Sequence, residues 1–142
     1  MLLDHALYQV ATKALLFKND KLLLLSEANG TYDFAGGRID STEFEIPLSE
    51  ALSREIREEL GDEIQYELGD IAFVTKRFYV DNTGFKHHII ALYFTAKYTG
   101  GDIKLSDEHA HFSWVNPTEI LANPEHFVSQ DEFEQFKKYF TK

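Results

Sequence analysis

The sequence predicts a layered α+β or α/β domain, and three observations support this fold class. Apolar runs joined by short turn sequences are typical of strands that pair as hairpins. One internal and one terminal segment carry the apolar spacing of helices instead. No repeat, linker or change of composition divides the 142 residues, a length that suits one domain. We therefore expect a single domain over residues 1–142 that is not doubly wound.

Composition and charge narrow the classes of function. Hydrophobic residues make up 44% of the chain, with only eight Gly and three Pro, which excludes a disordered or low-complexity protein. The net charge of −10 opposes broad contact with nucleic acid or an anionic membrane, because such contact needs many cations facing phosphates. The absence of Cys removes thiol nucleophiles and Cys-based zinc sites. With no secretory signal or membrane-spanning run, we expect a soluble cytoplasmic protein.

The first half of the chain is expected to form a hairpin, a long loop and a helix. The apolar runs Val10 to Phe17 and Leu22 to Leu25 flank an Asn-Asp turn. Ala28 to Glu45 is rich in Gly, Asp, Ser and Thr, which predicts an irregular functional loop. A helix is expected to have Pro47 in its first turn and to end at Gly61. Its apolar positions are Leu48, Leu52, Ile56 and Leu60.

The second half is expected to form another hairpin, a short strand and a terminal helix. Ile71 to Val80 and Phe85 to Tyr98 are strand segments around an Asp-Asn-Thr-Gly turn, and His111 to Val115 is a shorter one. Ser129 and Glu132 have the spacing of a capping box. The apolar face of the terminal helix, which we expect to pack in the core, consists of Phe133, Phe136 and Phe140.

Three carboxylates lie on the internal helix in an unfavourable place. Glu55, Glu58 and Glu59 share one face of its last two turns, repel one another and sit at the negative end of the helix dipole. At about 100° per residue, Glu59 falls beside the apolar stripe rather than opposite it. Such carboxylates are costly unless a divalent cation or an Arg neutralises them, and oxygen ligands favour Mg²⁺, Mn²⁺ or Ca²⁺. A solvated acidic face is the alternative.

The loop and the helix together resemble a known motif. Gly37, five residues, Glu43, and then Arg54-Glu55-Ile56-Arg57-Glu58-Glu59-Leu60-Gly61 is similar to the Nudix box. That motif is Gly, five residues, Glu, seven residues, Arg-Glu, an aliphatic residue, any residue, Glu-Glu, any residue, Gly and an aliphatic residue. The resemblance covers most of the chain and implies a Nudix-like α/β/α sandwich with a mixed sheet.

Two features depart from the Nudix box. Ten residues instead of seven separate Glu43 from Arg54, and Asp62 replaces the final aliphatic residue. A three-residue insertion in a loop costs little in closure entropy, so the loop and the helix can keep their relation. The insertion leaves open whether Glu43 or Glu45 pairs with Arg54.

The resemblance implies a role for each polar residue of the motif. Nudix proteins hold Mg²⁺, or Mn²⁺, against a diphosphate. The implied metal ligands are the Gly36 carbonyl, Glu55, Glu58 and Glu59. The implied catalytic residues are Arg54, Glu55, Glu58 and Glu108. Glu108 resembles a loop acid that serves as a further ligand or general base, Asp107 competes with it, and a solvated loop acid is the alternative.

Several residues near the motif are candidates for binding the substrate. Arg38 could hold a distal phosphate, and Tyr32 and Phe34 could stack on a base, although an aromatic side chain here can also cover the core. Tyr79 lies where the family's diadenosine polyphosphate hydrolases carry a Tyr. The apolar residues of the insertion, Phe44, Ile46 and Pro47, are expected to shape selection of the group beyond the diphosphate.

The sequence thus indicates a metal-dependent pyrophosphohydrolase that cleaves the P–O–P linkage of a nucleoside diphosphate linked to another moiety. The expected partner is a small-molecule nucleoside diphosphate derivative, with no nucleic acid and no membrane, and a homodimer stays open. A catalytically silent nucleotide-sensing module is the alternative, but silent Nudix members typically lose some of the helix glutamates. An isomerase acting on a diphosphate would need a longer chain and a catalytic Cys, which this chain lacks.

Overall fold

The computed structural model describes residues 4–26, 30–109 and 111–142. The strands are β1 (Gln9–Lys18), β2 (Lys21–Ser26), β3 (Tyr32–Asp33), β4 (Gly36–Arg38), β5 (Gln65–Val80), β6 (Lys86–Gly100) and β7 (His111–Val115). The α-helices are α1 (Leu48–Leu60), α2 (Pro117–Leu121) and α3 (Gln130–Phe140). The 3₁₀ helices are η1 (Ser41–Glu43) and η2 (Pro124–His126).

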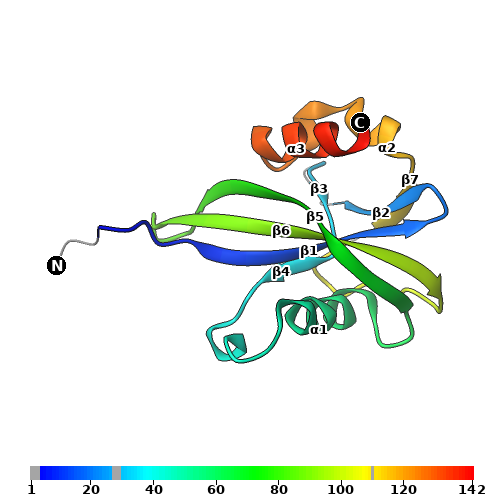
Figure 1. The fold of residues 1–142 in the computed structure, drawn as a ribbon, viewed down its shortest axis with the longest axis horizontal. Helices are drawn as coiled ribbons and strands as arrows, with labels where there is room; N and C mark the ends of the chain where they lie inside the picture. Colours follow the sequence, from blue (N-terminus) through cyan, green and yellow to red (C-terminus); the bar gives the residue numbers. More distant parts are fainter. Residues whose placement is uncertain (1–3, 27–29, 110) are drawn as a thin grey trace.

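The strands form a mixed sheet between two layers of helix. The strand order is β3-β2-β1-β6-β5, with β4 pairing β1 and β7 pairing β2. β1 and β6 run parallel, whereas the hairpin strands run antiparallel. In Figure 1, α1 lies on one side of the sheet and α2 and α3 lie on the other. This arrangement confirms the expected α/β/α sandwich.

Both hairpins form, and their strands are longer than the sequence predicts. β5 begins at Gln65, six residues before Ile71, and its pairing with β6 contains register shifts that let the long ribbon bend. The expected loop from Ala28 to Glu45 is not wholly irregular, because it contains β3, β4 and η1; residues 27–29 lie outside the described part. β4 forms because its backbone pairs with β1, a long-range contact that local composition does not indicate.

Helix α1 begins one residue later than expected. Pro47 has an extended ψ of 149° and is the N-cap rather than part of the first turn. Gly61, with φ of 92°, ends the helix in a conformation that favours glycine. Three members of the apolar stripe, Leu52, Ile56 and Leu60, are fully buried, whereas Leu48 remains 39% exposed. The N-terminal end of α1 therefore leaves apolar surface uncovered.

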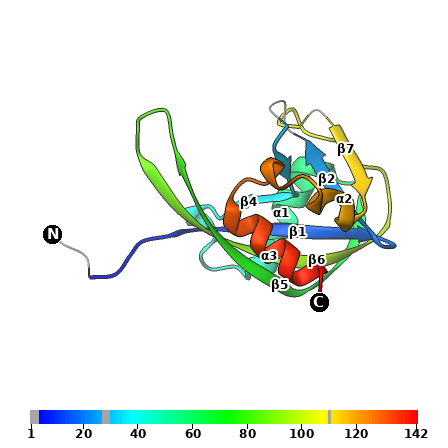
Figure 2. The same ribbon diagram turned by 90° about the horizontal axis from the view of Figure 1, so that it is seen from above.

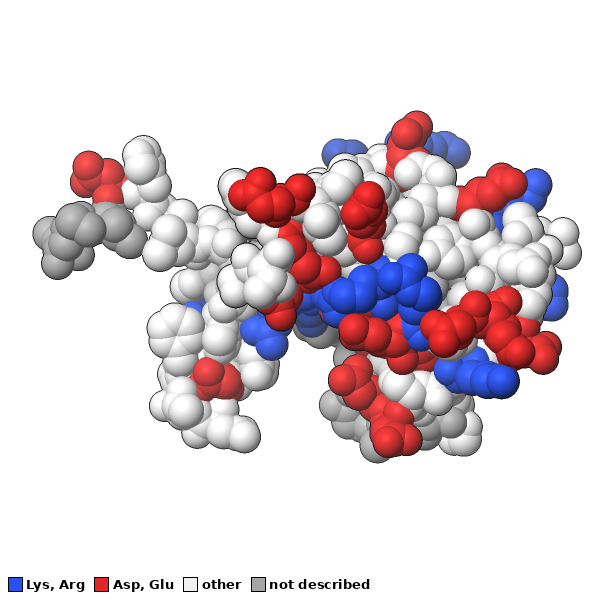
Figure 3. Space-filling view, turned by 90° about the horizontal axis from the view of Figure 1, so that it is seen from below, with Lys and Arg blue, Asp and Glu red and all other residues white. Residues whose placement is uncertain are grey.

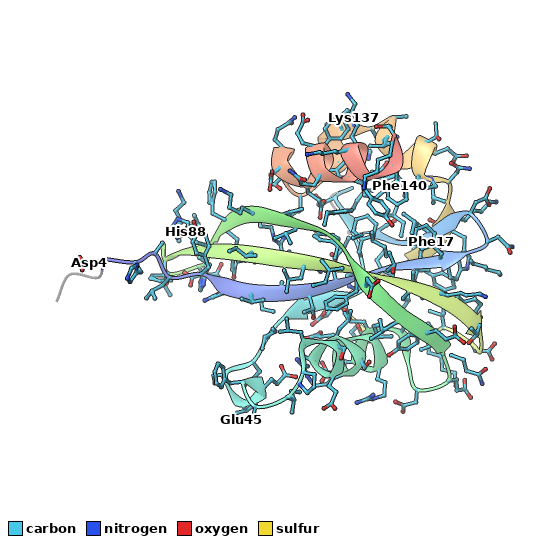
Figure 4. The ribbon with its side chains drawn as sticks, in the orientation of Figure 1. Asp4, Phe17, Glu45, His88, Lys137 and Phe140 are labelled. Carbon is cyan, nitrogen blue, oxygen red and sulfur yellow. The ribbon has the colours of Figure 1, made fainter. Side chains whose placement is uncertain are left out.

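Helix α3 closes the opposite face through its aromatic residues. Phe136 is fully buried, and Phe133 and Phe140 pack against the same core, as expected. Phe140 meets Phe17 of β1 with ring centroids 6.1 Å apart (Figure 4). Burial of each such side chain contributes about 1.5–3 kcal/mol, so these rings fix α3 on the sheet.

Only half of the expected capping box forms at the start of α3. The Ser129 hydroxyl accepts a hydrogen bond from the Glu132 amide at 3.1 Å. The Glu132 carboxylate does not return to Ser129; it accepts from the Val128 amide and from the Tyr93 hydroxyl of β6. The Glu132 side chain, which the sequence pattern assigns to the helix cap, therefore connects α3 to β6 instead.

The tip of the β5–β6 hairpin and the N-terminal arm extend away from the body of the molecule (Figure 2). Within the hairpin turn, Asp81 accepts hydrogen bonds from the amides of Thr83 and Phe85. Among the described residues, the helices are too short or too polar to cross a membrane.

Candidate active site

Arg54 of α1 joins the carboxylates of the motif. Its Nε and Nη2 donate to the two Glu43 oxygens at 2.6 and 2.7 Å, a forked pair that holds both side chains in one orientation. Glu43 is buried, and its hydrogen bonds with Arg54 lower its pKa. Glu45 is exposed on the outer side of the same loop (Figure 4). The structure therefore answers the question left by the insertion: Glu43 is the partner of Arg54.

The inserted residues lie between η1 and α1, which explains how the pair survives the longer spacing. Glu43 closes η1 by accepting from the Asp40 amide at 2.8 Å, and Asp40 accepts from the Thr42 amide in return. The chain then makes a turn after Glu43, in which the Ile46 amide donates to the Glu43 carbonyl. The extra length is thus accommodated after Glu43 and leaves its side chain directed at Arg54.

Arg54 also binds two of the helix glutamates. Its Nη1 donates to both Glu58 oxygens at 3.0 Å, and its Nη2 lies 3.1 Å from Glu55 Oε1. One guanidinium thus faces the carboxylates of Glu43, Glu55 and Glu58. A formal excess of negative charge remains, which fits a site for a cation with oxygen ligands.

Glu59 is the most enclosed of the three helix glutamates. Its Oε1 accepts from the Gly36 amide at 2.7 Å, and its Oε2 lies 2.8 Å from His109 Nε2. Burial raises the pKa of Glu59 because it disfavours the charged form, although both hydrogen bonds act in the opposite direction. Burial also raises the pKa of Glu55. A cation beside these groups would favour their ionised forms.

The glycine pair allows the loop to approach the helix closely. A Cβ atom on Gly37 would lie 3.0 Å from the carboxyl group of Glu55. Gly36 has φ of 131°, and a Cβ atom there would lie 2.0 Å from the Thr12 carbonyl oxygen. Gly36 is therefore required by its backbone conformation, whereas a side chain at position 37 would displace the carboxyl end of Glu55.

Lys13 of β1, which the sequence analysis did not identify, holds this loop against the sheet. Its buried Nζ donates to Asp33 Oδ1 at 2.9 Å and to the carbonyls of Phe34 and Gly36 at 3.2 and 3.1 Å. The Gly36 carbonyl, an expected metal ligand, is thus already an acceptor, although a carbonyl oxygen has a second lone pair. No local signal marks Lys13, because its role depends on the pairing of β1 with β4.

His109 and Asp33 are two further residues that the sequence analysis missed. Each of Asp33, Glu59 and His109 offers a possible ligand atom, and these atoms lie within 4.8 Å of one another. His109 is buried, one position after Glu108. The expected loop acids, Asp107 and Glu108, are exposed, and within the described ranges neither forms a hydrogen bond or an ion pair. Of this loop, His109 is the residue that contacts the helix, and the roles of Asp107 and Glu108 stay predictions.

A pocket of about 460 Å³ adjoins this site. It is lined by three expected substrate-binding residues, Tyr32, Arg38 and Tyr79, and by Lys13, Thr31, Asp33, Arg77, Phe78, Ile89 and Val128. Lys13 and Asp33 connect it to the glycine loop through the hydrogen bonds described above. Its basic residues outnumber its single carboxylate, which suits an anionic ligand.

The walls of this pocket are held by contacts among its own residues. The Arg38 guanidinium lies 5.2 Å from the centre of the Tyr79 ring, and its Nη1 donates to Gln9 Oε1 at 2.9 Å. Tyr79 stacks on His87, whose Nε2 lies 2.8 Å from Asp81 Oδ2. His87 thus has a packing role at the hairpin, apart from the helix glutamates.

Phe34 is a correction to the expected substrate-binding residues. Its side chain is 1% exposed and stacks against Phe136 of α3, so its ring cannot receive a base. The inserted residues are a second correction, because Phe44, Ile46 and Pro47 line a separate groove and not this pocket. Neither position could be assigned without knowing how the distant helix and strands pack.

The mixed sheet between helices, the carboxylates of α1 and the glycine loop define an α/β/α domain with an acidic site beside a glycine loop. A family model described as the NUDIX domain matches residues 7–136, so the chain belongs to the family of Nudix hydrolases. The nucleoside triphosphatase NudI of Escherichia coli strain SE11 is 29% identical over 96 residues. That match spans 65% of this chain and 66% of NudI.

Solved structures give the same result for the fold. The MutT protein from Methanosarcina mazei Go1 has a TM-score of 0.72 and 29% identity, with 95% of this chain and 96% of that chain covered. A possible asymmetric diadenosine tetraphosphate hydrolase from Jonesia denitrificans also has a TM-score of 0.72, at 18% identity, with 95% and 96% covered. An ADP-ribose pyrophosphatase from Streptococcus suis has a TM-score of 0.62 at 15% identity, with 94% and 92% covered. The last two likenesses concern the fold alone.

Proposed function

We propose that this chain is a metal-dependent pyrophosphohydrolase that cleaves the P–O–P linkage of a nucleoside diphosphate linked to another moiety. The observation that carries the proposal is the set of three carboxylates around the Arg54 guanidinium, with a fourth, Glu59, bound to the glycine pair. The name of one relative, a nucleoside triphosphatase, supports a nucleotide derivative as substrate. The Pro that ADP-ribose hydrolases of the family carry near Tyr79 is missing, which disfavours that substrate.

Glu55, Glu58 and Glu59, with the Gly36 carbonyl, would hold Mg²⁺ or Mn²⁺, since the donors are oxygens that these ions prefer. When bound, such ions offset charge on the phosphoryl oxygens and lower the pKa of a water molecule. Glu43 orients Arg54, and Arg54 in turn orients Glu55 and Glu58. Glu108 is proposed as the general base, because it is exposed and the next residue, His109, contacts Glu59.

The pocket would take the part of the substrate that lies beyond the cleaved linkage. Arg38 would face its negative charge, since the buried Lys13 ammonium already donates to three acceptors. The rings of Tyr32 and Tyr79 offer apolar surface for a base or a sugar. The proposed partners are therefore small nucleoside diphosphate derivatives, without nucleic acid or membrane. The cytoplasmic location and the single domain stay predictions.

A panel of nucleoside diphosphate derivatives with Mg²⁺ or Mn²⁺, read by product mass, tests the proposal. The panel should include nucleoside triphosphates, nucleoside diphosphate sugars and dinucleoside polyphosphates. Cleavage within the linkage should leave a phosphate group on each product, and hydrolysis in ¹⁸O-water should label one product only. Tight binding of a nucleotide without turnover of any compound would instead support the silent sensing module.

A further inference from the structure

The sheet face that carries α1 is only partly covered. The β5–β6 hairpin extends past the N-terminal end of α1 (Figure 1). Residues opposite one another in a strand pair share a face, and the register pairs Val74 with Leu92, Phe78 with His88 and Val80 with Lys86. Leu92 packs toward the α1 core, so this row of β5 and β6 residues faces the same side as α1.

An apolar groove lies between this row and the loop before α1. It measures about 930 Å³ and is formed by Val10, Ile90 and Leu92 on the sheet side and by Ile46, Pro47 and Leu48 on the loop side. Phe44 stands at its rim and is 86% exposed, and Phe78 and Val80 of the hairpin are 60% and 52% exposed. Figure 3 shows that the hairpin part of this face is largely uncharged. We call the groove together with Phe44, Val74, Phe78 and Val80 the apolar face.

The exposed area of this face is of the size that a protein partner covers. The exposed parts of its large side chains amount to about 700 Å², judged from ordinary side-chain areas. The largest apolar patch of a typical monomer is about 300–600 Å², whereas each partner in a standard interface contributes about 800 Å². An apolar surface of this extent, on a chain of charge −10, calls for a protein partner.

Charges around the apolar face favour a second copy of the same chain as that partner. Lys76 and Lys86 are exposed on the sheet side, with Lys86 Nζ 4.1 Å from the centre of the Phe78 ring. Asp40 and Glu45 are exposed on the loop side. A two-fold axis brings each region of one copy against the other region of its partner, so the lysines of each copy can face the acids of the other.

We propose that the apolar face is the interface of a two-fold symmetric dimer, in which the hairpin of each copy packs into the groove of the other. Phe78 and Val80 fill the partner's groove beside Phe44, and Lys86 faces Glu45 of the partner subunit. The three-residue insertion after Glu43 then has a purpose apart from the substrate pocket, because it builds one wall of this groove. The helix glutamates lie outside the contact, whereas Glu43 lines the groove and Phe78 also lines the proposed pocket, so the interface adjoins the site.

Sedimentation velocity from about 1 to 100 μM tests the proposal independently of activity. The wild-type chain should sediment as a species of twice 16.4 kDa. Phe78→Glu and Phe44→Glu should each weaken the dimer at least 100-fold, since each places a charge at the centre of the contact. Phe112→Glu is the matched control: Phe112 is an exposed aromatic on β7 outside the apolar face, and its variant should remain dimeric.

A charge exchange tests the orientation of the two copies. Lys86→Glu and Glu45→Lys should each weaken the dimer about tenfold, and the double variant should recover most of the loss because the opposed charges are restored. Thermal unfolding of each variant separates a lost contact from a lost fold. A wild-type chain that is monomeric at 100 μM overturns the proposal, as does a dimer that Phe78→Glu and Phe44→Glu leave intact.

Discussion

Each helix glutamate lies in a different environment, and the environment decides what the residue contributes. The side chain of Glu58 is 59% exposed and fixed by Arg54, whereas that of Glu59 is 5% exposed and hydrogen-bonded on both oxygens. Glu55 is intermediate and faces the glycine pair. Glu55 and Glu59, whose pKa values burial raises, therefore gain most from a bound cation.

We expect Glu58→Gln and Glu59→Gln each to lower kcat at least 100-fold, about 2.7 kcal/mol, because each removes a proposed ligand charge. Activity should require Mg²⁺ or Mn²⁺ and disappear in EDTA. In metal-free buffer the Tm of either variant should equal or exceed that of the wild type, since the substitution removes a like charge from a negative helix end. Full turnover in EDTA, or near-normal rates in both variants, would contradict the metal site.

Glu43 and Glu45 provide a matched pair of substitutions. Glu43→Gln should lower kcat about 10–100-fold with little change in KM, because the forked bond orients Arg54 toward the other carboxylates. Glu45→Gln, two positions away and exposed, should leave steady-state kinetics unchanged. Equal effects of the two substitutions would show that general loop charge, and not the Arg54 pair, is what the site needs.

At the scale of elements, the site depends on how closely β4 lies between β1 and α1. The Gly36 amide contacts a glutamate of α1, the Gly36 carbonyl contacts Lys13 of β1, and the next residue faces Glu55. A shift of β4 would therefore move the glycine loop relative to the carboxylates.

Replacing the two glycines of β4 by alanine should have different effects, one on stability and the other on activity. Gly36→Ala should destabilise the fold by roughly 2–3 kcal/mol, because its Cβ would meet backbone of β1 at a positive φ. Gly37→Ala should retain stability but lower kcat at least tenfold, because its Cβ would displace only the flexible end of Glu55. Urea unfolding and steady-state kinetics of both variants separate the two outcomes, and a stable Gly36→Ala would refute the packing argument.

The link between α3 and the sheet predicts a pH dependence of stability. Burial raises the pKa of Glu132 above its ordinary value of 4.5, so above that pH the folded state binds more protons than the unfolded state. The free energy of unfolding contributed by this group therefore falls as pH rises from 4.5 through the folded pKa. Relative to Glu132→Gln, the wild type should lose stability as the pH rises above 4.5, measured by urea midpoints. If the difference in stability between the two proteins did not change with pH, burial would not raise the pKa of Glu132.

The sequence predicts the elements better than the site. The apolar spacing of α1 and the turn residues of both hairpins are local, so these elements could be read directly. The burial of Phe34 depends on α3, which follows it by about a hundred positions, and the role of Lys13 depends on strand pairing. Glu43 and Glu45 could not be separated before the turn after η1 was known. The roles of these residues depend on contacts between elements that are distant in the sequence, and local patterns do not indicate such contacts.

At the scale of the whole molecule, the charge of −10 should couple cation binding to folding. A ligand that binds only the folded state at 100 times its Kd stabilises it by about 2.7 kcal/mol. We therefore expect millimolar Mg²⁺ or Mn²⁺ to raise the Tm of the wild type more than NaCl of equal ionic strength. The double variant Glu58→Gln/Glu59→Gln should show the same small rise with either salt. An equal response of the wild type to both salts would indicate charge screening alone.

Strand β5 ends the sheet order, and an end strand leaves backbone groups open to pairing with another extended chain. Helix α3 packs against β5, and Asp131 of that helix accepts a hydrogen bond from the Lys76 amide at 2.7 Å. Helix α3 therefore satisfies a backbone group at the edge of the sheet, in addition to packing in the core. Fraying of α3 would expose the Lys76 amide on the edge of β5, a strand of 16 residues. Opening of this helix is therefore expected to make the β5 edge more accessible to another extended chain.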